Sequence, residues 1–330
     1  MGALSAGPST AADGVPKPGT TVPSGPSEVV VGMYINDIQD LNLQAYTYTM
    51  DFYVWMRWTN PDLDPPATFE PMNPSESWGL IVTPLYDEPQ KMPDGSFYMQ
   101  TRYQGKFNNK MPLADYPFDT QELVMEFEDT QSGADQLTFV PDDPAVVLNQ
   151  EVVLPGYRIG EPFMEIVNKD YPTTFGDMRV SQPTPFSRVT VTVPVTRPAL
   201  AYAIKIIFPI FLVAITGSFV FFIASNLVES RIGMAITALL TLVALQFTAN
   251  AALPQVDYLM MIDALYVISY VFVIFALGVS VWNSRRAHKA EVAGVRLDYD
   301  TVDKHDKRLA MLSIGLYAIS VAAVCVYFLA

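Results

Sequence analysis

Four long apolar windows dominate the C-terminal part of the chain, whereas the N-terminal part is polar and rich in proline. None of the windows contains a charged residue, and they cover residues 206–228, 232–256, 264–284 and 309–330. A helix needs about 20 apolar residues to cross the hydrocarbon core of a bilayer. Because buried helices of soluble proteins seldom run this long without charge, the windows predict transmembrane helices at about 199–226, 230–253, 260–284 and 308–329.

Short runs of alternating apolar and polar residues fill the N-terminal part between residues 29 and 197, for example at 46–58 and 189–193. Turn signals such as Asp94-Gly95 separate the runs, and no segment keeps a 3.6-residue period. About ten short strands of this kind predict an immunoglobulin-like β-sandwich. Residues 1–28 are mainly Gly, Pro, Ser, Thr and Ala, and they are expected to form a disordered tail.

The loops between the predicted helices indicate how the chain is oriented. The loop at 285–307 and its edge carry the basic residues Arg285, Arg286, Lys289, Arg296, Lys304, Lys307 and Arg308, whereas 254–263 has none. The positive-inside rule then places the basic loop in the cytoplasm, and the N-terminal domain and the C-terminus outside. We therefore expect a multi-pass protein of the cell inner (plasma) membrane, with an extracytoplasmic β-sandwich at 29–197 and a four-helix transmembrane domain at 198–330.

The second predicted helix carries a distinctive stripe on one face. Its residues recur at intervals of three and four, which aligns them along a helix, and they are Gly233, Thr237, Leu240, Ala244, Phe247 and Ala251. Ringed around an axis, Leu240 and Phe247 would form dry constrictions that gate a pore by dewetting. Ordinary helix packing explains the stripe equally well. Glu229, just before it, is either a favourable charge at a helix N-terminus or part of a carboxylate ring that favours cations.

Acidic residues are concentrated in the predicted β-sandwich. Residues 1–197 carry 26 Asp and Glu against 11 Lys and Arg, and the whole chain has a net charge of −14. Such a surface repels nucleic acid and attracts cations, so no nucleic-acid partner is expected. Glu126, Glu128 and Asp129 are expected to lie on a solvated strand edge rather than to form a catalytic pair.

Residue types that catalysis needs are scarce. The two histidines, His288 and His305, both fall in the predicted cytoplasmic loop, which leaves none in the β-sandwich for a triad or a zinc site. The sequence contains no glycine-rich phosphate loop, and its single cysteine, Cys325, rules out an intrachain disulfide. We expect neither enzyme activity nor a cofactor.

A set of motifs resembles the pentameric ligand-gated ion channels, especially their prokaryotic branch. The most specific is Tyr-Pro-Phe-Asp-Thr-Gln at 116–121, which is similar to the family's aromatic-Pro-Phe-Asp-x-Gln loop. The others are Trp-Met-Arg-Trp at 55–58, Arg197 before the first helix, Pro209 within it and Leu-Pro at 253–254. The two cysteines that flank the loop in animal members are absent. The resemblance covers roughly residue 29 to the C-terminus, and it implies a homopentamer in membrane lipid with a fivefold axial pore.

The resemblance also implies which residues couple the outer domain to the pore. In the family the Pro-Phe-Asp loop rests on the loop after the second helix, here at 254–258. Asp119 is expected to meet Arg197 in a partly buried ion pair with Asp40 as a third member, although a simple Asx turn would also explain Asp119. The expected coupling residues are Asp40, Tyr116, Pro117, Phe118, Asp119, Arg197 and Pro254.

The sequence does not identify the agonist. The resemblance implies agonist sites between neighbouring outer domains, and the candidate ligand-binding residues are Tyr53, Tyr86, Glu128 and Phe186. Clustered outer-domain carboxylates titrate together and bind Ca²⁺, so protons and divalent cations are candidate effectors beside a small organic ligand. The expected function is a pentameric ligand-gated channel subunit that passes cations. The alternative is a membrane-anchored extracytoplasmic sensor or binding protein without conduction.

Overall fold

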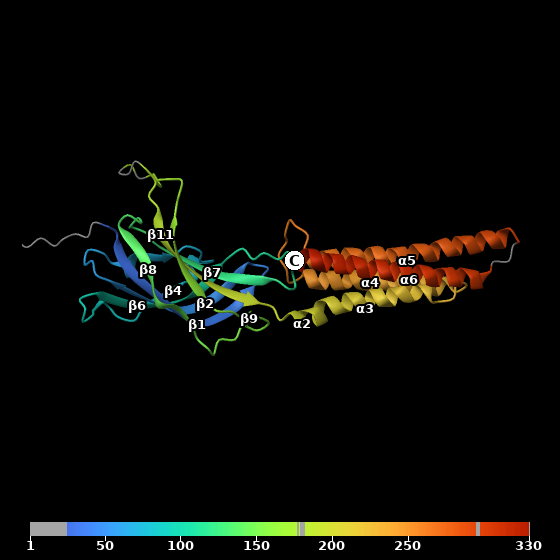
Figure 1. The fold of residues 1–330 in the computed structure, drawn as a ribbon, viewed down its shortest axis with the longest axis horizontal. Helices are drawn as coiled ribbons and strands as arrows, with labels where there is room; N and C mark the ends of the chain where they lie inside the picture. The colour runs from blue at the N-terminus through green and yellow to red at the C-terminus, as the bar shows by residue number, and fades with distance from the viewer. Residues whose placement is uncertain (1–24, 177, 179–181, 295–297, 330) are drawn as a thin grey trace, which may run out of the picture.

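The computed structural model describes residues 25–176, 178, 182–294 and 298–329. The molecule is elongated, with strands at one end and helices at the other (Figure 1). Two sheets lie between Ser27 and Thr196, and helices long and apolar enough to cross a membrane follow. The predicted order of a β-sandwich followed by four such helices is confirmed. Of the predicted tail, residues 1–24 lie outside the described residues.

The first sheet has six strands. Its path is β4 (Ile81–Pro84), β6 (Phe97–Asn108), β2 (Thr47–Trp58), β1 (Ser27–Asn42) and β8 (Leu137–Leu148), and β5 (Gln90–Lys91) pairs with β6. Neighbours are antiparallel except β1 and β8, which run parallel. In β2 every second side chain is buried, including Tyr48, Met50 and Phe52. This period of two turns one face of the sheet toward the core.

The second sheet has five strands. Its path is β10 (Phe163–Lys169), β11 (Phe186–Thr196), β7 (Thr120–Asp129) and β3 (Phe69–Pro71), and β9 (Arg158–Ile159) pairs with β11. A single helical turn, α1 (Pro65–Thr68), precedes β3. Phe127 meets Phe52 of the first sheet edge-on with the ring centroids 5.8 Å apart, and within the second sheet it stacks on Phe69 at 4.8 Å. Large aromatic rings bury much apolar surface, so this cluster helps to hold the sheets face to face.

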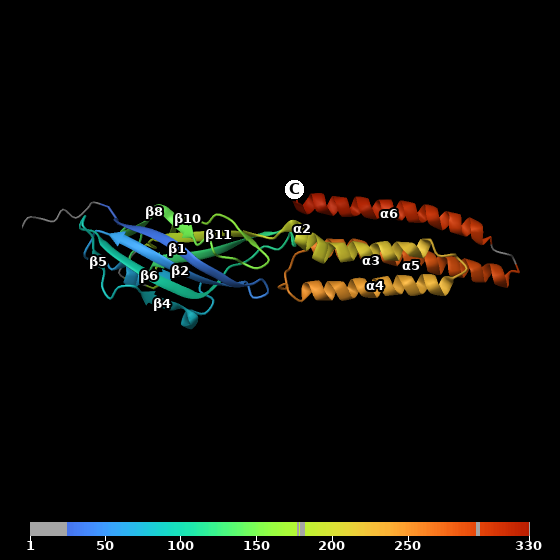
Figure 2. The same ribbon diagram turned by 90° about the horizontal axis from the view of Figure 1, so that it is seen from below.

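Four helical rods follow the sheets. The first comprises α2 (Ala199–Tyr202), a π-helical turn (Ala203–Ile207), α3 (Phe208–Ser218) and a 3-10 turn (Phe219–Phe221), and the others are α4 (Val228–Asn250), α5 (Met261–Val292) and α6 (Tyr299–Leu329). Figure 2 shows α4 and α6 on opposite sides of the bundle, with α3 and α5 between them. All four rods are long and apolar enough to cross a membrane, which indicates a membrane protein.

The first rod changes helix type just before Pro209. Proline has no backbone N–H, so the carbonyl of Lys205, four residues earlier, loses its α-helical partner. The π-helical turn at Ala203–Ile207 surrounds that carbonyl. A short π segment inside an α-helix is a common way to accommodate such a break.

The third and fourth rods are longer than predicted, because the expected loop at 285–307 is mostly helical. The helix α5 continues to Val292 and α6 begins at Tyr299. Arg, Lys, Ala and Glu are strong helix formers, so charge ends the apolar window without ending the helix. The basic residues expected in the loop are exposed on these extensions, except Arg296, which lies outside the described residues.

Candidate functional site

A buried ion pair lies where the outer domain joins the first helix. The pairing of β11 with β7 places Thr196 opposite Thr120, so the residues beside them, Arg197 and Asp119, are neighbours. Arg197 Nε donates to Asp119 Oδ1 at 2.9 Å, and the two side chains are 4% and 3% exposed. Burial alone would lower the pKa of Arg197, but the Asp119 carboxylate outweighs it and raises that pKa above its ordinary value. Arg197 is therefore charged.

Three tyrosine rings enclose the Arg197 guanidinium. Its central carbon lies 5.0 Å from the ring centroid of Tyr116, 4.7 Å from that of Tyr157 and 5.1 Å from that of Tyr202. Burial raises the pKa of Tyr157 to about 12, so this ring stays neutral at physiological pH. Aromatic faces attract a cation that has lost its water, so the cage offsets part of the cost of burying Arg197. Tyr157 and Tyr202 carry no local sequence signal, and sequence reasoning missed them.

The segment before Tyr116 bonds to the α4–α5 connection. The Leu113 N–H donates to the Tyr258 hydroxyl at 2.9 Å, and the Met261 N–H donates to the Ala114 carbonyl at 2.8 Å. Phe118 packs on an apolar cluster that includes Met261. The contact with 254–258 is made by Leu113, just before the predicted loop, whereas Phe118 of the loop packs near Met261. The predicted pairing of Tyr116 and Asp119 with 254–258 stays a prediction.

A cavity of about 660 Å³ opens beside the ion pair. Asp40 lines it together with Arg197 and Tyr116, and the backbone of Asp40 has a φ of 51°. Among the described residues Asp40 forms no ion pair, so the expected third member lies near the pair without joining it. Pro254 is buried in the α4–α5 connection. Asp40 therefore lies at the junction of the sheets and helices, with the cavity between it and the ion pair.

The predicted stripe of α4 faces away from the rest of the protomer. Its residues are all exposed: Glu229, Gly233, Thr237, Leu240, Ala244, Phe247 and, one residue past the helix, Ala251. Leu240 is 63% exposed and Phe247 75%, as are apolar side chains on the other rods, for example Leu312 at 71%. The Thr237 hydroxyl donates to the Gly233 carbonyl at 2.8 Å, so its oxygen stays free to accept a hydrogen bond.

The opposite face of α4 provides the helix packing. Ala235, Ala238 and Leu242 are buried there, at intervals of three and four. Near the C-terminal end of α4, the Tyr270 hydroxyl of α5 donates to Gln246 Oε1 at 2.7 Å. Small residues let helix backbones approach closely. Packing within one protomer therefore does not use the stripe. Ordinary helix packing inside a single subunit, one of the two explanations left open by the sequence, does not account for it.

Two of the three acids expected on a solvated strand edge are buried. Arg188 on β11 lies directly opposite Glu128 on β7, and their side chains pair at 2.6 Å. Burial alone would lower the pKa of Arg188, but the hydrogen bond and charge of Glu128 raise it above its ordinary value. Asp129 accepts hydrogen bonds from the Gln131 and Ser132 N–H groups. The edge expectation is wrong for Glu128, which pairs with Arg188 on the neighbouring strand, and for Asp129, which is held by backbone N–H groups of the turn that follows β7.

The aromatic candidates for ligand binding lie in two separate places. Phe186 meets Tyr171 edge-on at 5.9 Å, and the Tyr171 hydroxyl donates to Glu128. Tyr53 lies on the other sheet under the guanidinium of Arg102, and Tyr86 is exposed. The structure therefore brings Phe186 and Glu128 together within one subunit and leaves Tyr53 and Tyr86 apart from them.

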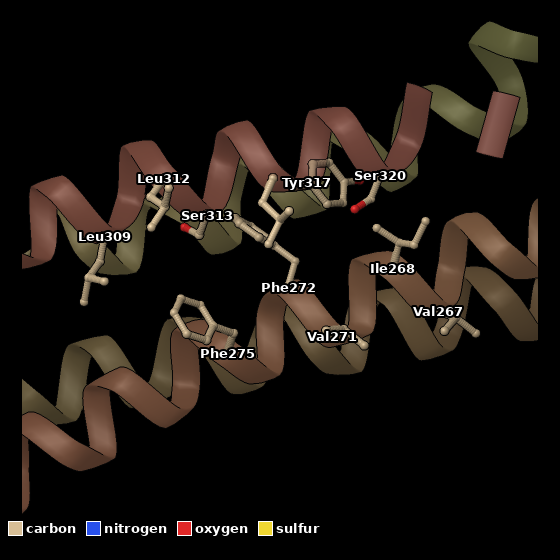
Figure 3. A pocket seen from close by; sticks show the side chains of 11 residues that line it. Val267, Ile268, Val271, Phe272, Phe275, Leu309, Leu312, Ser313, Tyr317 and Ser320 are labelled. Carbon is tan, nitrogen blue, oxygen red and sulfur yellow. The ribbon is translucent and has the colours of Figure 1, made fainter. Parts of the chain in front are cut away.

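An apolar cavity of about 450 Å³ lies between α5 and α6 (Figure 3). Phe272 and Phe275 of α5 face Leu312 and Tyr317 of α6 across it. None of its lining residues is charged. The cavity lies apart from both the ion pair and the exposed stripe.

The structure combines a β-sandwich with four long apolar helices, and a buried ion pair lies where the two parts join. None of the protein-family models matches the chain. It is 24% identical over 206 residues to a gamma-aminobutyric acid receptor subunit beta of Lymnaea stagnalis, which covers 60% of this chain and 39% of that protein. Identity is 21% over 271 residues with the human receptor subunit rho-3, covering 76% and 56% of the two chains.

A third relative is the gamma-aminobutyric acid receptor subunit beta-4 of Gallus gallus, 22% identical over 275 residues, which cover 77% of this chain and 54% of that one. The chain thus spans between about two fifths and just over half the length of these curated relatives. All three are subunits within the pentameric ligand-gated ion channel family. The similarity is weak, and it agrees with the family that the motifs indicated.

Proposed function

We propose that the chain is one subunit of a pentameric ligand-gated ion channel in which α4 lines a water-filled pore. The observation that carries the proposal is the exposure of the whole stripe on a helix whose other face is already packed. The stripe mixes Glu229 and Thr237 with Leu240 and Phe247, so neither lipid nor water alone suits all of it. Five copies around an axis would give the polar residues water and bring the bulky ones together.

In such a ring Leu240 and Phe247 form the closed gate. Each is more than half exposed in the protomer and free to meet its four symmetry copies. A narrow ring of apolar side chains excludes water and thereby ions. The similarity to receptor subunits supports assembly of several subunits around an axis, and a homopentamer is the form that we propose.

Gating would pass through the junction at the ion pair. A stimulus at the outer domain shifts the equilibrium between a closed and an open state. The outer domain contacts the helices at two points. Arg197 lies just before α2, and Leu113 bonds to Tyr258 in the connection that follows α4. Movement of the outer domain would then tilt α4 and widen the rings at Leu240 and Phe247.

The agonist belongs to one of three classes: protons, divalent cations or a small organic ligand. The relatives are named as receptors of gamma-aminobutyric acid, so this amino acid joins the candidates for our chain. Phe186 and Glu128 would contribute one side of a site between subunits, and Tyr53 and Tyr86 the side of a neighbour. Recording during pH steps and during addition of Ca²⁺ or gamma-aminobutyric acid separates the classes.

We further propose a preference for cations and an inner-membrane location with the outer domain outside the cytoplasm. Glu229 is exposed in the first turn of α4, where five copies would form a carboxylate ring at the pore mouth. The exposed bases on the extensions of α5 and α6 fit the cytoplasmic side. Reversal potentials in a salt gradient measure the preference directly.

The test combines single-channel recording with cysteine accessibility. The purified full chain in planar bilayers should give unitary currents under at least one of the stimuli above. In a Cys325→Ser background, Thr237→Cys should lose current when a water-soluble thiol reagent is added in the open state. Ala238→Cys, on the packed face one residue away, is the matched control and should not react.

Two outcomes would overturn the proposal. Failure to record unitary currents under every stimulus, with correctly assembled protein, would favour the sensor without conduction. Equal reactivity at positions 237 and 238 would mean that α4 does not line the conduction path even if currents are seen.

A further inference from the structure

A buried arginine holds the start of α4 to the last helix. Arg231 is 1% exposed, although it lies in the first turn of α4. Its Nη1 donates to Asp306 of α6, and its Nη2 lies 3.4 Å from Asp303 Oδ1 on the same helix. Its Nε donates to the carbonyl of Ile223, before α4, at 2.8 Å. The helices α4 and α6, which lie on opposite sides of the bundle (Figure 2), are therefore joined at this end.

Both carboxylate oxygens of Asp306 accept hydrogen bonds in this contact. Its side chain is 1% exposed, and Asn283 of α5 donates to both of its oxygens, at 3.0 and 2.9 Å. Asp303 in turn accepts the backbone N–H of Ser225 at 2.9 Å. One carboxylate of α6 thus bonds α4 and α5, and the other bonds α4 and the segment before it. A buried charge this well paired costs the fold little, whereas removal of either partner leaves the other uncompensated.

The position of Arg231 gives the ion pair an electrostatic consequence. Arg231 follows Glu229 by two residues, and Glu229 is exposed with no ion-pair partner among the described residues. Five subunits would place five such glutamates at one mouth of the pore and five arginines about one helix diameter, roughly 10 Å, behind them. Charges at this separation still act on each other, because the Debye length at physiological salt is about 8 Å.

We propose that Asp306 is a positioning residue for ion selectivity, which neutralises Arg231 so that Glu229 alone sets the sign of the field at the pore mouth. This inference rests on the proposed channel function. The helix that lies farthest from the pore would thereby determine which ions enter it. The other bases at this end, Arg285, Arg286 and Lys289 among them, are exposed on the extension of α5, where salt screens them.

The expected effect follows from the charge that Asp306→Asn would unmask. Asparagine keeps the shape of the side chain but leaves Arg231 with only the partly exposed Asp303 as counterion. The loss of five negative charges at about 10 Å, screened by physiological salt, should lower the ratio of cation to anion permeability roughly fivefold to tenfold. The reversal potential in a salt gradient should move accordingly toward that of the anion.

The experiment measures reversal potentials of the full-length channel in planar bilayers, with a tenfold KCl gradient, for the wild type and four variants. Asp306→Asn should show the shift and Asp306→Glu, which keeps the charge, should not. Asp300→Asn is the matched control, because Asp300 is an exposed acid one and a half turns earlier on α6, outside the contact. Arg231→Gln combined with Asp306→Asn removes both charges and should restore the cation preference of the wild type.

The double variant keeps the test decisive if Asp306→Asn fails to assemble. No arginine is left to unmask in it, so a shift toward anions there would overturn the inference. A wild type that conducts cations together with an Asp306→Asn channel of unchanged reversal potential would also overturn it, while leaving the channel function intact. Absence of current from the wild type would overturn both.

Discussion

Asp119→Asn tests how strongly the ion pair at the domain junction holds the outer domain. The side chains of Asp119 and Arg197 are 3% and 4% exposed, and the bonded atoms are 2.9 Å apart. Asparagine keeps the shape and one acceptor oxygen, but it leaves the guanidinium buried without a counterion. The rings of Tyr116, Tyr157 and Tyr202 still attract that cation, by about 0.5–2 kcal/mol each, in both proteins. They therefore do not compensate for the loss.

The magnitude follows from the burial of the pair. Removing one partner of a buried ion pair costs about 3–5 kcal/mol. Gln121 adds to this cost, because its Nε2 donates both to Asp119 at 2.5 Å and to the Pro112 carbonyl at 2.6 Å. In a domain of this size 1 kcal/mol moves the unfolding temperature by roughly 2–4 °C. We expect Asp119→Asn to lower the unfolding temperature of the outer domain by about 6–20 °C.

The assay is thermal unfolding of the detergent-solubilised full chain, monitored by tryptophan fluorescence. Three of the four tryptophans lie in the outer domain, and the fourth is Trp282. Arg197→Gln and the double variant complete a double-mutant cycle. The double variant should be more stable than Asp119→Asn alone, since no buried charge is left unpaired. A fall of less than about 2 °C in Asp119→Asn, or a double variant no more stable than the single one, would refute the reasoning.

Two further predictions concern the sheets of the outer domain. Gly32→Ala should lower the unfolding temperature by about 2–12 °C, because overpacking costs about 1–3 kcal/mol and the new Cβ would lie 2.3 Å from the Trp55 indole. Gly79→Ala, whose Cβ meets nothing nearer than 3.6 Å, is the control in the same scan. The hydrogen bond from Arg102 holds the pKa of Asp51 below its ordinary value, so the stability that this carboxylate contributes is present at neutral pH and is lost on acidification. The difference in unfolding temperature between wild type and Asp51→Asn should therefore narrow as the pH falls below about 4, and a constant difference would contradict it.

Periodicity made the elements predictable, and contacts between elements were harder. The alternation in β2 and the three-and-four spacing through Leu240 and Phe247 are properties of one segment, so the sequence displays them directly. Glu128 was placed wrongly because its partner, Arg188, comes from a strand that is 60 residues away in the chain. Register between strands depends on the whole sandwich, which no local pattern encodes.

Arg231 was missed for a different reason, although a signal was available. The boundary of the second apolar window was drawn just after this residue, which made it look like an ordinary flanking charge. An ionisable side chain at the edge of a membrane helix is often paired inside the bundle. The partner, Asp306, belonged to a segment predicted as loop, so the extension of α6 had to be known before the pair could be inferred.

The strand β11 is separated from the first helical rod by only two residues. Its last rung pairs Thr196 with Thr120, Arg197 and Pro198 follow, and α2 begins at Ala199. The short connection of Arg197 and Pro198 therefore fixes how the first helix is rotated relative to the strand. Anyone who grafts a foreign outer domain onto this bundle must keep the number of residues across the joint, because one extra residue would turn the arginine to the opposite side of the strand and away from its aspartate.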